Sequence, residues 1–169
     1  MARLLTQADA VLDRIGRLFL LLAGLLLVAM LAGNAANIAS RNFFGTAILF
    51  VFPWTIVFFV WGSFLSFFVI YRRRRDIAVE FLVRRLPPGP QRIATTIAGV
   101  TTLVVTGVLV WQAPGILALQ VGPVSDLVDI ERYLLSIPLF ISSALIFIDT
   151  LVTLLRAALG MPQVEDARH

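Results

Sequence analysis

Four apolar stretches, each long enough to cross a lipid bilayer, constrain this chain more than any other feature. They cover about residues 18–39, 49–71, 93–113 and 133–155. Roughly 20 helical residues cross a hydrocarbon core of about 30 Å, and a helix satisfies its own backbone hydrogen bonds in lipid. β-barrel strands are shorter and alternate in polarity. The sequence therefore predicts an all-α integral membrane protein, one domain over residues 1–169, with four transmembrane helices.

The arginines predict the orientation of these helices. The chain has 14 basic residues and no lysine. Twelve of the arginines lie before the first stretch, between the second and third, or after the fourth, and only Arg41 and Arg132 lie in the other two connections. Arginine favours the cytoplasmic side, so we expect both termini and the central connection in the cytoplasm. The first stretch exceeds the roughly 7–15 apolar residues of a cleaved signal peptide, and we expect a permanent helix there.

Composition argues against an enzyme. The chain is 59% hydrophobic, has no cysteine, and has His169 as its one histidine. It therefore lacks redox-active thiols, buried histidines for haem and a Cys/His cluster for zinc. The net charge of +4 comes from arginines that flank apolar stretches, which does not indicate a nucleic-acid partner. We expect no catalytic residue, no metal site and no cofactor.

The connection between the second and third stretches is the most polar part of the chain. Residues 76–86 predict a short amphipathic helix in the membrane interface, with Asp76, Glu80 and Arg84 on one face and a stop at Pro87. The alternative is a short strand with Ile77 and the residues alternating from it on one side. The arginines of this region are expected to set topology and to attract anionic phospholipid, or else to contact an acidic loop of a partner; they are Arg72, Arg73, Arg74, Arg75, Arg84 and Arg85.

A few polar or small residues interrupt the apolar stretches. Asp149 lies inside the fourth stretch, where we expect it to reach the interface or to pair with a basic residue; the alternative is an ion or proton site. Other positions are expected to serve helix packing or partner contact, with interhelical hydrogen bonds from the asparagines; they are Asn34, Asn37, Trp61, Gly62 and Ser66. The acidic outer connection carries Asp126, Asp129 and Glu131, either as a solvated cap or as a docking surface for an extracytoplasmic partner.

The order of these features resembles a known family. Trp61-Gly62 is followed by the arginine run, by Ile77, Val79 and Glu80, and by Leu86-Pro87, and the fourth stretch opens with Tyr133-Leu134 and Pro138-Leu139. This order is similar to the small membrane subunit of tripartite ATP-independent periplasmic (TRAP) transporters, the DctQ-like family, over about residues 18–155. Asp76 stands where that family usually has histidine.

The resemblance implies a non-catalytic subunit of a secondary, sodium-coupled uptake transporter in the bacterial inner membrane. Its partners would be a large multi-span transport subunit, a periplasmic substrate-binding protein and membrane phospholipids. Two alternatives stay open from the residues themselves: a small transporter that assembles with itself, and an anchor or assembly subunit of another complex.

Overall fold

The computed structural model describes residues 2–74, 88–125 and 128–159. Its elements, in chain order, are the helices α1 (Ala2–Phe44), α2 (Val51–Arg74) and α4 (Pro88–Leu119), the strands β1 (Pro123–Ser125) and β2 (Val128–Glu131), and the helix α5 (Tyr133–Ala158). Four helices in the described residues are long and apolar enough to cross a membrane. The predicted four-helix membrane fold is therefore confirmed. The predicted interfacial helix at residues 76–86 lies outside the described residues.

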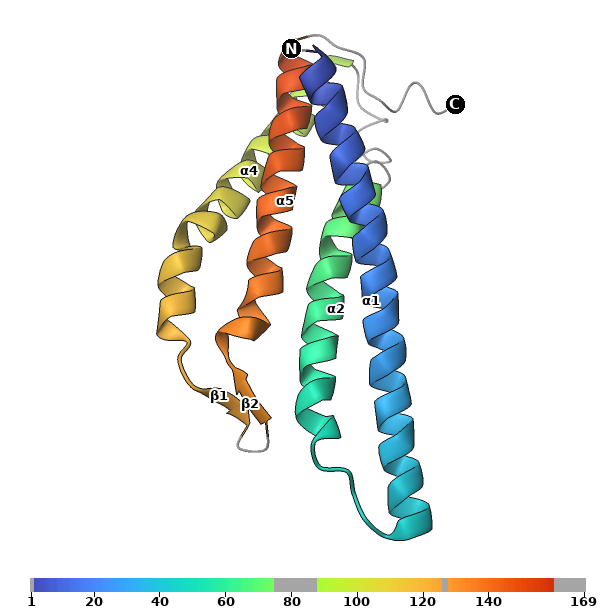
Figure 1. Ribbon diagram of the computed structural model, residues 1–169. Coiled ribbons are helices and arrows are strands. Elements are labelled where there is room, and N and C mark those ends of the chain that lie inside the picture. Colours follow the sequence, from blue (N-terminus) through green and yellow to red (C-terminus); the bar gives the residue numbers. More distant parts are fainter. Residues whose placement is uncertain (1, 75–87, 126–127, 160–169) are drawn as a thin grey trace.

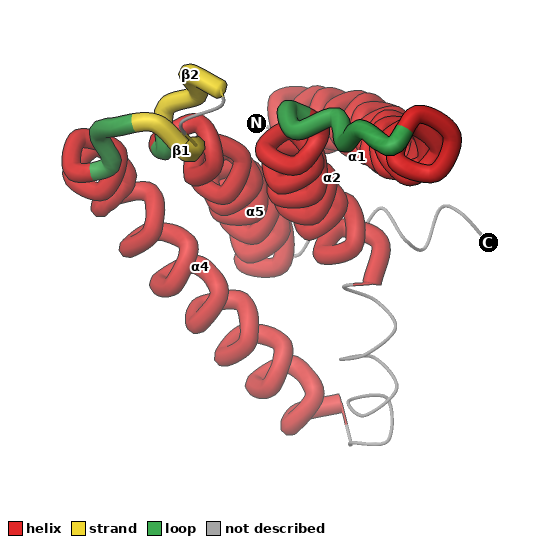
Figure 2. The backbone as a smooth tube through the Cα atoms, turned by 90° about the horizontal axis from the view of Figure 1, so that it is seen from below, coloured by secondary structure: helices red, strands yellow, loops and turns green. Residues whose placement is uncertain are grey.

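The helices form an elongated up-and-down bundle (Figure 1). α1 packs against α2, α2 packs against α5, and α1 also meets α5. α4 packs chiefly on α5, and it leans away from α1 and α2 when the bundle is viewed along its length (Figure 2). α2 and α5 run in the same direction, opposite to α1 and α4. α5 is therefore the helix that connects α4 to the rest of the bundle.

α1 is much longer than the apolar stretch that predicts it. The stretch covers about residues 18–39, whereas the helix runs over 43 residues from Ala2 to Phe44. The additional residues before the apolar stretch are amphipathic: Leu5, Leu12 and Gly16 are buried, while Gln7 and Arg14 are exposed. This spacing places the buried positions on one helical face, so the polar N-terminal part continues the helix against its neighbours.

Two short antiparallel strands join α4 to α5. Pro123 pairs with Glu131 and Ser125 with Val128, with an irregularity between the two pairs. The turn into β1 uses Gly122 at φ +109°, a backbone conformation that a side chain would strain. The backbone N–H of Gly122 donates to Oε2 of Glu131 at 3.0 Å, and the N–H of Arg132 donates to the carbonyl of Gly122 at 3.0 Å. The outer connection thus contains a pair of antiparallel strands, which the sequence does not predict.

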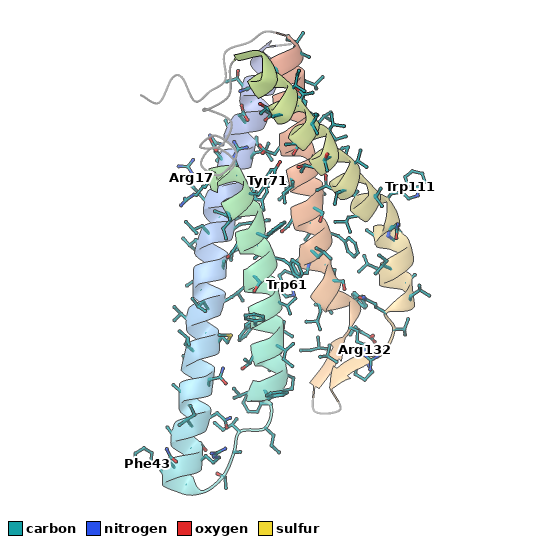
Figure 3. The ribbon with its side chains drawn as sticks, turned by 180° about the vertical axis from the view of Figure 1, so that it is seen from behind. Arg17, Phe43, Trp61, Tyr71, Trp111 and Arg132 are labelled. Carbon is teal, nitrogen blue, oxygen red and sulfur yellow. The ribbon has the colours of Figure 1, made fainter. Side chains whose placement is uncertain are left out.

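The apolar core lies toward the end of the bundle that holds the N-terminus. Leu12, Phe68 and Ile146 come from α1, α2 and α5 and pack together. Phe19 meets Phe68 edge to face, with ring centroids 5.8 Å apart. Elsewhere the helices expose large apolar side chains, and Trp111 on α4 is 88% exposed and points away from the bundle (Figure 3). Lipid or protein partners must cover these surfaces.

Candidate functional site

The most elaborate polar site is a group of charged residues beside the apolar core, which we call the charge cluster. It consists of Asp9, Asp13, Arg72, Asp149 and Arg156. α1 supplies the first two residues, α2 supplies Arg72, and α5 supplies the last two. Asp9 and Asp13 are four residues apart, so they project from one face of α1. Three helices therefore meet at this cluster.

Arg72 is the centre of the cluster. Its Nε donates to Oδ1 of Asp13 at 2.9 Å, and its Nη2 lies 2.8 Å from the same oxygen. Nη2 also donates to the backbone carbonyl of Asp9 at 3.1 Å and lies 3.6 Å from the Asp9 carboxylate. Nη1 pairs with Oδ1 of Asp149. The planar guanidinium can make these contacts together because it carries several donors in a fixed arrangement.

Asp149 and Arg156 bring α5 into the cluster. The Asp149 side chain is only 3% exposed, and its carboxylate is paired with Arg72. Arg156 is buried two turns further along α5 and pairs with Asp9. Asp9 therefore contacts an arginine on each of the two neighbouring helices. The sequence alone leaves Asp149 open between pairing and an ion or proton site, and the structure places it in an ion pair.

This pairing has a clear physical reason. An unpaired Asp in the middle of a transmembrane helix costs about 2.5–3.5 kcal/mol on insertion scales. Ionisable residues within a bundle accordingly pair with one another or face water. Removing one partner of a buried pair leaves a charge without compensation and costs about 3–5 kcal/mol. The cluster therefore couples the positions of α1, α2 and α5 to one another.

A second set of polar contacts connects α2 to α5 along their length. The indole N–H of Trp61 donates to the carbonyl of Leu134 at 3.0 Å, and Trp61 lies between the two helices (Figure 3). The hydroxyl of Ser142 donates to the carbonyl of Phe64 at 2.6 Å. Near the charge cluster, the hydroxyls of Tyr71 and Thr150 lie 3.0 Å apart. These three contacts form what we call the α2–α5 seam.

Clustered carboxylates can also serve as ligands of a metal ion. Within residues 2–74, 88–125 and 128–159, no group of three or more His, Cys, Asp or Glu side chains could hold a metal ion. The carboxylates of the charge cluster contact guanidinium groups instead. This arrangement can orient the three helices relative to one another.

Comparison with known proteins agrees with this architecture. The profile of a family described as "Tripartite ATP-independent periplasmic transporters, DctQ component" matches residues 30–160. The chain belongs to this DctQ family. No curated protein and no solved structure matches the chain significantly. Within the DctQ match lie Arg72, Asp149, Arg156 and the whole α2–α5 seam, whereas Asp9 and Asp13 precede it.

The DctQ chain uses its predicted packing residues in different ways. A Cβ added to Gly62 would lie 3.8 Å from the Ala23 carbonyl oxygen and 3.9 Å from Cβ of Leu26, so Gly62 faces α1. Asn34 donates to the hydroxyl of Thr55 on α2 at 3.0 Å. Asn37 accepts the backbone N–H of Ile48 at 2.7 Å and thus holds the α1–α2 connection. Ser66 is half-buried in α2.

The predicted surface residues are only partly described. Arg73 is exposed, and α2 ends at Arg74. Glu131 is half-buried and accepts the Gly122 N–H within the hairpin. Asp129 belongs to β2. The remaining positions lie outside the described residues; they are Arg75, Asp76, Glu80, Arg84, Arg85 and Asp126.

Two residues of the charge cluster, Asp9 and Asp13, are not predicted from the sequence. They precede the first apolar stretch and read as ordinary charges near a terminus. The available signal is their spacing with Leu5 and Leu12: these four positions fall on one face of a helix. A carboxylate on an otherwise apolar face indicates a buried basic partner.

Proposed function

We propose that this DctQ chain is the small membrane subunit of a TRAP-type solute uptake transporter driven by an ion gradient, with sodium as the coupling ion. In this proposal it scaffolds the large transport subunit in the bacterial inner membrane. The family match carries the proposal, because it covers residues 30–160 of a chain of 169. The DctQ component acts in a tripartite system with a large subunit and a substrate-binding protein.

The polar groups of the bundle support a scaffolding role. Asp149, the carboxylate that the sequence places inside the fourth span, pairs with Arg72. Asn34 and Trp61 make hydrogen bonds between helices. A transporter that works alone needs ionisable or polar groups available to its solute or coupling ion. In the described part of the chain, these groups hold helices together.

The outer surfaces of the helices favour association within the membrane. α4 exposes apolar side chains over its length, including Ile93, Val104 and Trp111. Because α4 packs chiefly on α5, much of its circumference is available to another protein or to lipid. We propose that the large transport subunit and membrane phospholipids cover these surfaces.

We further propose that the hairpin end of the bundle faces the periplasm and helps to dock the substrate-binding protein through Asp126, Asp129 and Glu131. The positive-inside rule supports this orientation, since Arg14, Arg72 and Arg156 lie toward the opposite end of the bundle. Cysteine labelling tests it directly, because the chain has no cysteine of its own. A cysteine at exposed Gln7 should react with an impermeant maleimide only after the membrane is opened, and one at exposed Thr46 should react in intact cells. The reverse pattern contradicts the orientation.

Purification of the tagged chain from membranes in mild detergent tests the function itself. The expected companions are a large multi-span protein in fixed ratio and, with substrate present, a periplasmic binding protein. Solute uptake by vesicles should require both membrane proteins. Uptake by vesicles that contain this chain alone would instead establish a self-assembling transporter, and co-purification with an unrelated enzyme complex would establish an anchor subunit.

A further inference from the structure

The N-terminal part of α1, residues 2–17, is not needed to cross the bilayer, because the charge-free apolar stretch begins at Leu18. It also precedes residues 30–160, which define the family match. We call this segment the strap. The structure nevertheless packs it closely against the other helices: Leu5 is 9% exposed and Leu12 is 3% exposed.

The two faces of the strap differ in what they meet. Its inner face carries Asp9 and Asp13, which contact Arg72, and Asp9 also contacts Arg156. Between these acids, Leu12 packs on Phe68 and Ile146. The outer face carries Gln7, Arg14 and Arg17, all exposed, and Arg17 points away from the bundle (Figure 3). Ion pairs therefore connect the strap to α2 and α5, and Leu12 lies between the strap and these helices.

Arg72 and Arg156 lie within residues 30–160, which the family profile matches, whereas Asp9 and Asp13, which contact them, belong to the strap. The strap contributes buried Leu12 and partly buried Ile15 to the apolar core cluster. Salt bridges are directional and depend on both partners, while apolar contact does not select a partner in this way. The strap is thus held by ion pairs in addition to apolar contacts, and a change of charge removes the ion pairs.

We propose that the ion pairs of the charge cluster hold the strap against α2 and α5, over the apolar cluster of Leu12, Phe68 and Ile146. Loss of these charges opens the strap, so that it separates from α2 and α5, while the membrane-embedded bundle stays assembled. The embedded part keeps its own contacts, because Trp61, Ser142 and Asn34 make their interhelical hydrogen bonds without the strap. The device is a local conformational element, and its behaviour is independent of the transport role proposed above.

A thiol reporter beneath the strap tests this proposal. Leu12→Cys is introduced into the full chain, which has no other cysteine, and its reaction with a water-soluble maleimide is followed in mild detergent. Asp9→Asn with Asp13→Asn should raise the labelling rate at least tenfold. The matched control, Arg14→Gln with Arg17→Gln, changes two exposed charges of the same segment and should leave the rate unchanged. Gln7→Cys, an exposed reporter on the same helix, should react quickly in every background.

Gel filtration separates strap opening from loss of the fold, and labelling is scored on the monodisperse peak. If the double asparagine variant does not yield that peak, Arg156→Gln decides, because it removes a partner of Asp9 from α5 and leaves the strap sequence intact. This variant should also accelerate labelling of Leu12→Cys, by several fold. Equal labelling in the native, asparagine and Arg156→Gln backgrounds would overturn the proposal, as would an equal increase in the Arg14 and Arg17 control.

Discussion

The indole N–H of Trp61 donates to the carbonyl oxygen of Leu134, the group that Pro138 leaves without its helical donor. In an α-helix the carbonyl of residue 134 accepts from the N–H of residue 138, and proline has none. A side chain on α2 therefore supplies the hydrogen bond that α5 cannot make. This relationship explains why a proline is tolerated inside a helix that crosses a membrane.

Trp61→Phe should destabilise the protein by about 1–3 kcal/mol, because it leaves the Leu134 carbonyl without this donor while it keeps an aromatic ring. Thermal unfolding in detergent measures the loss. The same change in a Pro138→Ala background should cost much less, since the alanine N–H can supply the helical bond. Trp111→Phe is the control, because Trp111 is 88% exposed. Equal losses in the two backgrounds would contradict this explanation.

Arg72 and Arg73 are adjacent in sequence, but we expect their substitution by glutamine to reduce the stability of the protein by very different amounts. Arg72→Gln should cost about 3–5 kcal/mol, because it leaves Asp149 buried without its partner. Arg73→Gln should cost less than about 1 kcal/mol, because Arg73 is exposed. The fraction of monodisperse protein after heating compares the two variants. Similar losses would show that position in the arginine run, rather than ion pairing, determines stability.

Cysteines at Leu26 and Gly62 should form a disulfide on mild oxidation. A Cβ added to Gly62 lies 3.9 Å from Cβ of Leu26, within the range of about 3.5–4.5 Å that disulfides require. Leu27 is 53% exposed and lies on another face of α1, so Leu27→Cys with Gly62→Cys is the matched control. A mobility shift on a non-reducing gel reports the bond. Cross-linking of the control pair alone would place Gly62 against a different face of α1.

Gly107 is a contact point between α4 and α5. A Cβ at this position would lie 3.2 Å from Cε2 of Phe147, so Gly107→Val should overpack the contact and cost about 1–3 kcal/mol. Gly24→Val is the control, because nothing lies within 4 Å of a Cβ added to Gly24. Thermal unfolding in detergent compares the two. A loss in the control as large as that in Gly107→Val would point to the valine itself rather than to the α4–α5 contact.

Much of the fold can be predicted from the sequence, because a chain in lipid must satisfy its backbone hydrogen bonds internally. Long apolar stretches such as residues 133–155 must become helices, and the structure gives helix Tyr133–Ala158 there. The helix of residues 2–17 is harder to predict, since an amphipathic segment forms a stable helix only when a neighbour covers its apolar face. The hairpin depends on pairing between Pro123 and Glu131, which local sequence does not determine.

For the charge cluster, the sequence indicates which residue needs a partner, but it does not indicate which residue that partner is. The sequence marks Asp149 as unusual, because a carboxylate in an apolar stretch needs compensation. Its partner is 77 residues away on α2, and periodicity within α5 does not identify it. Arg156 lies near the face of Asp149 and reads from sequence as a neighbouring charge, yet it pairs with Asp9 on α1. Only the arrangement of the three helices determines which charges meet.

The length of α1 has a consequence for its place in the membrane. The helix contains no proline between Ala2 and Phe44, and at 43 residues it measures about 64 Å, roughly twice the thickness of the hydrocarbon core. It carries the ion pairs of the charge cluster near one end and Phe43 and Phe44 at the other. The hydrocarbon core accommodates only about half of this length, so the rest of the helix must lie in the interfacial regions or in water.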